Sequence, residues 1–376
     1  MFGLGRGTRL MGAAMAVAAS ALLTASAVAQ EPVKIGVTMP LTGNLAFDGQ
    51  NAVKGMEVAV AAINGAGGVL GRPLELVVLD DKSNPEEGVN AVKRLMADEK
   101  VNVLATAMTS SVGLAQVDAT AGKILHVIVM ASAPAITEKG YKNVFRVNTT
   151  FASKEKPLID TIRTQVKSVA MLATNDDYGR GVVDMYKKAW GDEGPKVTSE
   201  GFVQINETDL LPYLTRIKFE QPDGLMLTLM SSQLATAMKQ AKQIGLTPEV
   251  IWTSGGGINP TLLKLGGESV DGLVASDNYV PGSDSEANKT FVARLKERYP
   301  EDSPQLYQAV AYDAVMVIAQ AIEAAGTADD WQKIAEEMHK VSYDSPRGKL
   351  GFDEKGQVAL SPFLVRVENG AMVELK

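Results

Sequence analysis

The chain alternates short apolar runs with longer segments that have the 3.6-residue periodicity of amphipathic helices. Val33–Met39 (VKIGVTM) is a predicted strand, and Asn51–Ile63 follows it as a predicted helix. The same alternation continues through residues 74–130 and is repeated over residues 154–253. Strands separated by helices form parallel sheets whose faces are covered by those helices. The sequence therefore predicts an α/β fold built from two similar series in tandem.

The alternation changes after the second series. One more strand is predicted, then three helices in close succession, then two short strands that look antiparallel. In order, these segments are 272–276, 287–298, 305–325, 331–341, 348–352 and 363–367. They either return to complete the two earlier series or form a third unit, and the pattern alone leaves both readings open.

Residues 1–29 differ from the rest of the chain. Arg6 and Arg9 precede an apolar, alanine-rich run at Met11–Leu23, and Ala27-Val28-Ala29 then offers small residues at a cleavage site. A membrane anchor is the alternative, but the run is shorter than the roughly 20 residues that span a bilayer. The sequence therefore predicts a secretory signal peptide, cleaved after Ala29, and an exported mature protein.

The mature chain is acidic. The full sequence has 37 Lys and Arg against 44 Asp and Glu, and loss of Arg6 and Arg9 leaves 35 against 44, a formal charge of −9. This balance argues against nucleic acid or an anionic membrane as the main partner. An anionic ligand would have to be held by local donors. The 376 residues contain no cysteine, which excludes disulfides, thiolate chemistry and Cys-ligated metals.

Enzyme signatures are weak in this sequence. His126 lies at the edge of an apolar strand and His339 near a helix end, where a structural role is more common than a catalytic one. There is no G-x-S-x-G elbow, no G-x-x-x-x-G-K-[ST] phosphate loop and no dinucleotide fingerprint. Asp80-Asp81 and Asp176-Asp177 follow predicted strands, where acids most often cap helices and turns. We therefore expect no catalysis.

Three predicted strands are followed by loops rich in hydroxyls and small residues, namely Leu41-Thr42-Gly43-Asn44, Thr106–Ser111 and Ala131-Ser132-Ala133-Pro134. Ligands of parallel α/β sheets bind beyond the carboxyl ends of the strands. The free N–H groups of a helix N-terminus, with Ser or Thr hydroxyls beside them, suit a carboxylate or phosphate. The alternative is that the hydroxyls only cap helices. Gly255-Gly256-Gly257 is either an anion-binding nest or a flexible turn.

Several segments resemble landmarks of the branched-chain amino-acid type solute-binding proteins of ABC importers, in the order of that family. The longest is Ile63–Pro85, which reads INGAGGVLGRPLELVVLDDKSNP. The others are Pro40-Leu41-Thr42-Gly43, Ser132-Ala133-Pro134, Asn175–Gly181 (NDDYGRG) and Gly351-Phe352-Asp353. Each piece is weak alone, but the set covers the whole mature chain.

The resemblance implies a type I periplasmic-binding fold, with two lobes joined by three crossovers and the ligand in the cleft. Each lobe is a mostly parallel sheet with helices on both faces. Lobe one would comprise residues 30–147 plus 277–341, and lobe two residues 148–276 plus 342–376. The resemblance further implies a periplasmic protein, expected to be a monomer, that closes on its ligand and docks on an ABC permease. No cofactor, metal ion or nucleic acid is expected.

Ligand contacts also follow from the resemblance. Members of the family hold the ligand carboxylate with a Ser or Thr after the third strand and a small-residue loop after the fourth. These positions match Thr109 or Ser110 and Ala131 with Ser132. A tyrosine of lobe two closes over the ligand and matches Tyr178.

One departure from the family concerns the amino group of the ligand. Amino-acid binders place an acid in lobe two to pair with the ligand ammonium, and that position aligns here with Gly255. An ammonium buried without a counter-charge costs several kcal/mol. Either Asp48, Asp277 or another acid replaces the missing one, or the ligand has no amine, as in an aromatic or 2-oxo acid. The residue before the first cleft helix often packs on the ligand side chain, and Phe47 and Asp48 are the candidates.

The sequence therefore predicts a substrate-binding protein for a small carboxylate, either a branched-chain amino acid or an aromatic or 2-oxo acid. A ligand-sensing receptor of the same fold is the alternative. A secreted α/β hydrolase is a remote third reading. A sugar-responsive repressor is disfavoured, because a signal peptide and not a basic DNA-binding segment precedes lobe one.

Overall fold

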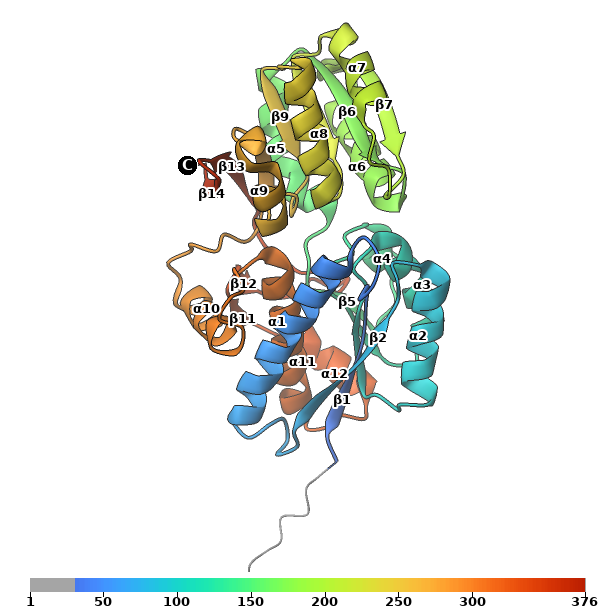
Figure 1. Ribbon diagram of the computed structural model, residues 1–376. Helices are drawn as coiled ribbons and strands as arrows, with labels where there is room; N and C mark the ends of the chain where they lie inside the picture. Colours follow the sequence, from blue (N-terminus) through green and yellow to red (C-terminus); the bar gives the residue numbers. More distant parts are fainter. Residues whose placement is uncertain (1–30, 376) are drawn as a thin grey trace, which may run out of the picture.

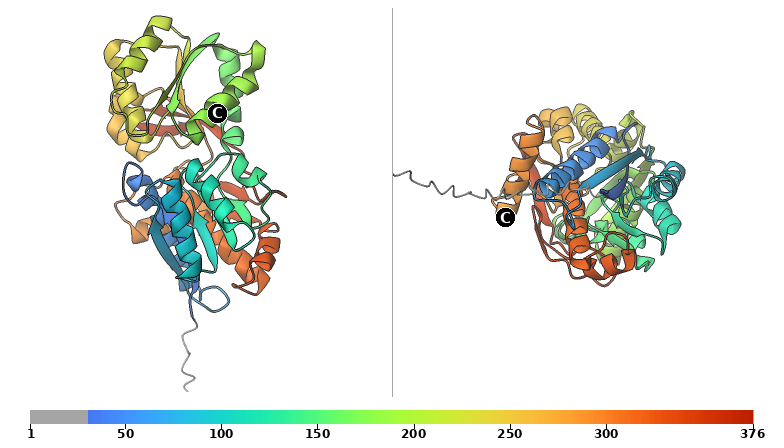
Figure 2. Two further views of the ribbon diagram at one scale, coloured as in Figure 1. Left: turned by 90° about the vertical axis from the view of Figure 1, so that its right-hand side faces the viewer. Right: turned by 90° about the horizontal axis from the view of Figure 1, so that it is seen from below.

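The computed structural model describes residues 31–375, so the predicted signal peptide lies outside the described residues. Figure 1 shows two lobes joined by extended segments, and the left view of Figure 2 shows the same division. The predicted two-lobed α/β fold is confirmed. Within residues 31–375, no helix combines the length and apolar character needed to cross a membrane.

The first lobe is built on a parallel sheet of order β2-β1-β3-β4-β5. Its strands are β1 (Val33–Met39), β2 (Leu74–Asp80), β3 (Val103–Thr106), β4 (Leu125–Ile128) and β5 (Val144–Arg146). The side chains of β3, β4 and β5 are all buried, as expected for a parallel sheet covered on both faces. Consequently these strands are apolar runs and not alternating patterns.

Helices from two distant parts of the chain cover this sheet. The first group is α1 (Ala46–Gly65), α2 (Pro85–Ala97), α3 (Ser110–Thr120) and α4 (Ala135–Glu138); the second is α10 (Glu286–Arg298), α11 (Leu306–Ala325) and α12 (Trp331–Met338). The two groups pack closely: a Cβ added to Gly55 of α1 would lie only 2.2 Å from the carbonyl oxygen of Gln308 in α11. Only glycine permits that approach. The late helices therefore complete the first lobe and do not form a third unit.

The second lobe has a seven-stranded sheet of order β14-β13-β10-β9-β8-β6-β7. Its parallel part runs β7-β6-β8-β9-β10, which repeats the strand order of the first sheet. The parallel strands are β6 (Ser168–Thr174), β7 (Lys196–Val203), β8 (Gly224–Thr228), β9 (Val250–Thr253) and β10 (Val274–Asp277). Two more strands, β13 (Phe363–Glu368) and β14 (Ala371–Glu374), extend the sheet in antiparallel fashion beyond β10, with β14 at the edge. The predicted strand at 363–367 is β13. The strand β14 was not predicted, and the predicted strand at 348–352 lies outside this sheet.

The helices of the second lobe alternate with its parallel strands. They are α5 (Phe151–Gln165), α6 (Asp177–Trp190), α7 (Leu211–Glu220), α8 (Ser231–Ile244) and α9 (Pro260–Gly266). Asp176 caps α6 by accepting a hydrogen bond from the Gly179 N–H at 2.9 Å. Asp80 accepts hydrogen bonds from the Leu41 and Lys82 N–H groups. The expected capping and turn roles of these acids are thus observed.

Three connections join the lobes, at residues 147–150, 278–285 and 351–362. Strands β11 (Tyr343–Ser345) and β12 (Gly348–Leu350) precede the third one, and Leu350 and Val358 belong to the same apolar core as β1. We therefore propose that lobe one extends to about residue 360, beyond the boundary at 341 predicted from the sequence.

Candidate ligand-binding site

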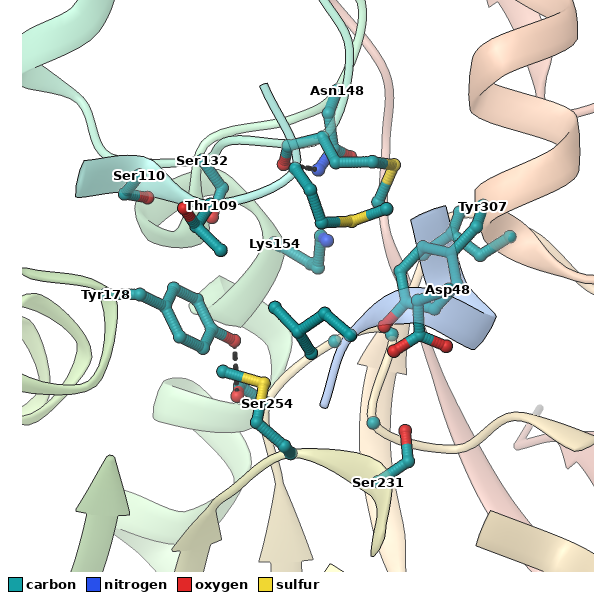
Figure 3. A pocket seen from close by; sticks show the side chains of 18 of the residues that line it. Asp48, Thr109, Ser110, Ser132, Asn148, Lys154, Tyr178, Ser231, Ser254 and Tyr307 are labelled. Atoms are coloured by element: carbon teal, nitrogen blue, oxygen red, sulfur yellow. Dashed lines mark hydrogen bonds between the residues drawn. The ribbon is translucent and has the colours of Figure 1, made fainter. Parts of the chain in front are cut away.

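A pocket lies between the lobes, where the carboxyl ends of the two parallel sheets face each other (Figure 3). Strand order reverses between β1 and β3 in the first sheet and between β6 and β8 in the second. The segments after these four strands supply Asp48, Thr109, Tyr178 and Ser231 to the pocket. Such reversal points are where open α/β sheets bind ligands. The empty volume is about 740 Å³, including space open to solvent.

The β3–α3 loop forms one wall of the pocket. Ala107 has a left-handed backbone conformation (φ 70°), and its carbonyl oxygen accepts hydrogen bonds from the N–H groups of Met130 and Ala131. This strained turn ties the loop after β3 to the loop after β4. Thr109 is the N-cap residue of α3, yet its side chain makes no capping hydrogen bond and its Oγ1 is buried without a partner within residues 31–375. The hydroxyl and the helix N-terminus are therefore suited to a ligand anion.

The loop after β4 is held in place by Arg146. The guanidinium donates to the carbonyl oxygens of Ala133 (2.6 Å) and Ala131 (3.4 Å) and to the Gln357 side chain (2.6 Å). Arg146 is fully buried, and this burial lowers its pKa to about 9. Arg146 does not line the pocket, but it fixes the loop that carries Ser132, which does.

Tyr178 approaches the pocket from the second lobe. It lies at the start of α6, and its hydroxyl donates a hydrogen bond to the Ser254 Oγ at 2.6 Å (Figure 3). Its ring makes an edge contact with Phe151, with the ring centroids 6.3 Å apart. Burial and the nearby Glu155 carboxyl raise the pKa of Tyr178 above its usual value. The residue therefore presents a neutral, fixed aromatic wall.

The only cationic side chain that lines this pocket within residues 31–375 is Lys154, from the first turn of α5. The residue is 4 % exposed and its ammonium faces the pocket (Figure 3). Inside the described part of the chain it has no hydrogen-bond partner, and no carboxylate lies within 4.0 Å of its Nζ. Burial lowers its pKa, although the charges of Asp277 and Glu155 partly offset that effect. An acceptor supplied by a ligand would satisfy this ammonium.

The glycine run 255–257 does not form a free anion nest. Gly255 donates its N–H to Glu155 Oε1 at 2.8 Å, and Gly256 donates to Asp277 Oδ2 at 3.1 Å. The Gly257 N–H is bound to the Ser254 carbonyl. The turn reading of this run is therefore correct and the nest reading is wrong, because two carboxylates of the protein take the donors. Burial raises the pKa of Glu155 to about 7.

The opposite side of the pocket carries Asp48 and Tyr307. Asp48 falls in the first turn of α1, because that helix begins at Ala46 and not at Asn51 as predicted. It is 8 % exposed, and burial raises its pKa to about 7. Neither its carboxyl group nor the Tyr307 hydroxyl has a hydrogen-bond partner within residues 31–375.

The structure brings together most of the residues predicted from the sequence. Six of them line the pocket: Asp48, Thr109, Ser110, Ser132, Tyr178 and Gly255. Three do not. Phe47 is 53 % exposed, Ala131 is buried against Gly113, and Asp277 lies behind the glycine turn, where its carboxylate accepts the Gly256 N–H. Thr42, in the third hydroxyl-rich loop, donates instead to Asp80 at 2.6 Å.

Sequence reasoning missed Lys154, Tyr307 and the positioning role of Arg146. A signal for Lys154 was present, because Phe151, Lys154 and Leu158 are spaced as one helical face and all three are buried. A lysine on an otherwise apolar face indicates either a snorkelling side chain or a site. The sequence held no comparable signal for Tyr307 or Arg146.

Catalytic and metal chemistry find little support in the described residues. His126 is fully buried, with Nε2 2.6 Å from the Thr106 hydroxyl and Nδ1 2.8 Å from the Thr120 hydroxyl. His339 is exposed and lies near the Asp353 carbonyl oxygen. Between residues 31 and 375, no group of three or more His, Cys, Asp or Glu is arranged to hold a metal ion.

Comparisons with known proteins agree with this architecture. Residues 32–371 match the family model described as periplasmic binding protein. The Leu-, Ile-, Val-, Thr- and Ala-binding protein of Pseudomonas aeruginosa is 29 % identical over 363 residues, covering 96 % of both chains. The crystal structure of the leucine-binding protein LivK of Thermotoga maritima is similar with a TM-score of 0.84 and 29 % identity, covering 92 % of this chain and 98 % of that one.

A second similar structure contains an aromatic acid. It is a solute-binding protein of an ABC transporter from Rhodopseudomonas palustris in complex with benzoate, with a TM-score of 0.85, 22 % identity, and coverage of 92 % and 95 % of the two chains. At that identity the likeness shows the fold alone. The family match and the two-lobed fold together establish that this chain belongs to the type I periplasmic binding proteins of the branched-chain amino acid type.

Proposed function

We propose that this protein is the exported substrate-binding component of an ABC importer and captures a small carboxylate that lacks an α-ammonium group. The ligand would be an aromatic or 2-oxo acid. Its carboxylate would bind at the β3–α3 and β4 loops and Lys154, and the second lobe would then close over it with Tyr178. The protein would present the closed form to a permease in the membrane. Family membership supports a binding role over catalysis.

The proposal of an acid without an amine rests on the unpaired ammonium of Lys154. A buried cation is stabilised by an acceptor with negative charge, and the pocket supplies none within 4.0 Å of the Lys154 Nζ from residues 31–375. An amino-acid ligand would bring its own ammonium into the same space. Two cations in one water-poor pocket repel each other strongly. An acid without an amine avoids that repulsion.

Binding of a branched-chain amino acid is the second candidate. The relative from P. aeruginosa is named as a binding protein for leucine, isoleucine, valine, threonine and alanine. In this protein the acid of the pocket lining that has no hydrogen-bond partner within residues 31–375 is Asp48. Asp176 also lines the pocket but caps α6, and Asp277 and Glu155 accept hydrogen bonds from the glycine turn. This reading requires the ligand ammonium to lie on the Asp48 side, away from Lys154. A sensing receptor remains the alternative to transport.

Pairs of ligands that differ only at Cα separate the two candidates. The mature protein is unfolded, freed of bound ligand and refolded, and its thermal unfolding is followed with leucine against 4-methyl-2-oxopentanoate and phenylalanine against phenylpyruvate. Benzoate is added as an acid with neither an amino nor an oxo group. A ligand at about 1,000 times its Kd stabilises the protein by roughly 4 kcal/mol.

Stabilisation by oxo acids or benzoate but not by the matching amino acids supports the proposal. Stabilisation by leucine alone contradicts it and favours Asp48 as the partner of an ammonium. Transport is tested separately, by measuring uptake of the identified ligand in cells with and without the gene. Unchanged uptake combined with a lost transcriptional response would favour a receptor.

A further inference from the structure

Asp48 and Tyr307 form a polar pair at the end of the pocket opposite Thr109 and Ser132 (Figure 3). They come from the starts of α1 and α11, helices far apart in the sequence. The Asn51 side chain accepts a hydrogen bond from Gln308 at 3.3 Å and so links the two helices one turn away. The relative position of Asp48 and Tyr307 is therefore fixed by the packing of the first lobe.

The burial of Asp48 has no structural explanation within residues 31–375. An acid in the first turn of a helix interacts favourably with the helix dipole, but an exposed acid would do so equally well. Asp48 is instead 92 % buried, faces the pocket and accepts no hydrogen bond from the described residues. Its oxygens are still open to the pocket space, but once a ligand fills that space a carboxyl group without a donor is costly. A donor on the ligand would remove that cost.

We propose that Asp48 and Tyr307 recognise a hydroxyl group at the end of the ligand remote from its carboxylate. The protein would then select hydroxylated carboxylic acids over the same acids without the hydroxyl. This inference rests on the proposed function, since it assumes that the carboxylate binds at the Thr109 and Lys154 side.

A hydroxyl fits the pair better than an ammonium does. Its O–H donates to the Asp48 carboxylate while its oxygen accepts from the Tyr307 O–H, so that both groups gain a partner. An ammonium has no acceptor to offer Tyr307 and would share the pocket with the Lys154 cation. Between the two polar ends the walls are mainly apolar and include Met108, Met130 and Leu306. The middle of the ligand should accordingly be apolar.

Matched pairs of acids test the hydroxyl directly by titration calorimetry at pH 8, above the pKa of about 7 that burial gives Asp48. The pairs are benzoate and 4-hydroxybenzoate, phenylpyruvate and 4-hydroxyphenylpyruvate, and hexanoate and 6-hydroxyhexanoate, which cover three lengths. A hydrogen bond to a charged group corresponds to a preference of about 10- to 100-fold. We expect at least one hydroxylated acid to show it with the unaltered protein.

Substitutions assign that preference to the two residues. In Asp48→Ala the hydroxylated acid should lose its advantage over the parent acid. Tyr307→Phe keeps the ring and should reduce the advantage of the hydroxylated acid. This variant still tests the inference if Asp48→Ala does not fold. Glu86→Ala removes an exposed acid from the first turn of α2 and should leave both affinities unchanged.

The outcomes separate this inference from the proposed function. If the parent acids bind but no pair shows a hydroxyl preference, or if Asp48→Ala keeps the preference, the inference is wrong and the proposed function stands. If no acid binds while leucine does, and Asp48→Ala abolishes leucine binding, both are wrong and Asp48 pairs with an ammonium.

Discussion

A Cβ atom on Gly255 would lie 1.9 Å from Cδ of Lys154 and 2.3 Å from the carbonyl oxygen of Ser276. The lysine side chain therefore occupies the space that any side chain at position 255 would need. An acid at this position, as amino-acid binders of the family have, is incompatible with Lys154 where it lies. Under the proposed function, the two residues together replace a site for a ligand cation by a cation of the protein.

Gly255→Ala should therefore displace Lys154 and weaken both stability and ligand binding. Overpacking of this kind costs about 1–3 kcal/mol of unfolding free energy, measurable by urea denaturation. Gly282→Ala is the matched control, because Gly282 has no atom within 4 Å of the added Cβ and no positive φ. Equal stability of the two variants would show that the close approach is easily relieved.

Lys154→Met should weaken binding of a carboxylate by about 10- to 100-fold, because a charge-assisted hydrogen bond is lost. Methionine keeps much of the apolar stem and its packing. Lys156→Met, an exposed position in the same helix with an ion pair to Asp160, should leave the affinity unchanged. Titration calorimetry with the identified acid distinguishes them, and equal affinities would remove Lys154 from the site.

The hydroxyl groups of Thr109 and Ser132 are expected to contact the ligand carboxylate. Combined Thr109→Ala and Ser132→Ala should weaken binding by roughly 1–3 kcal/mol per lost charged hydrogen bond. Thr42→Ala serves as the control, since that hydroxyl donates to Asp80 outside the pocket. An unchanged Kd in the double variant would contradict the carboxylate assignment.

Arg146 should affect ligand affinity without touching the ligand. Arg146→Leu leaves the carbonyl oxygen of Ala133 and the side chain of Gln357 without their donor, at about 1–3 kcal/mol for each buried group. We expect a lower thermal midpoint and a weaker Kd, because the loop carrying Ser132 loosens. Arg163→Leu breaks only an exposed ion pair with Glu193 and should cost at most about 1 kcal/mol.

His126 should make the protein less stable in acid. Burial lowers its pKa from 6.5 to about 3, so below about pH 6.5 the unfolded chain binds a proton that the folded chain does not. The contribution of His126 to stability is therefore full above pH 6.5 and is lost as the pH falls toward 3.

The measurement compares unfolding free energies at pH 7 and pH 4.5 in the unaltered protein and in His126→Gln. The loss on acidification should be smaller in the variant by up to about 2–3 kcal/mol. The difference between the two proteins is needed, because the raised pKa of Glu155 acts in the opposite direction between about pH 4.5 and 7. An equal loss in both would place the proton on His126 in the folded state.

The sequence by itself determined the α/β class, the two tandem series and the loops that carry Thr109 and Ser132. These features follow from local periodicity and from the rule that parallel strands end at one edge of the sheet, so that loops after the strands meet. Tyr178 and the missing acid at Gly255 followed from the resemblance to the family. None of these inferences required knowledge of contacts between distant segments.

Only the tertiary structure decided what chemistry fills the pocket. The Gly255 N–H is bound by Glu155, 100 residues away, and Arg146 reaches Gln357, 211 residues away. Whether an N–H or a lysine is free for a ligand depends on which distant groups the fold brings beside it, and a local pattern carries no record of those partners. A helical face in the sequence held a signal for Lys154, but its position as the cation that faces the pocket became apparent only when both lobes were in place.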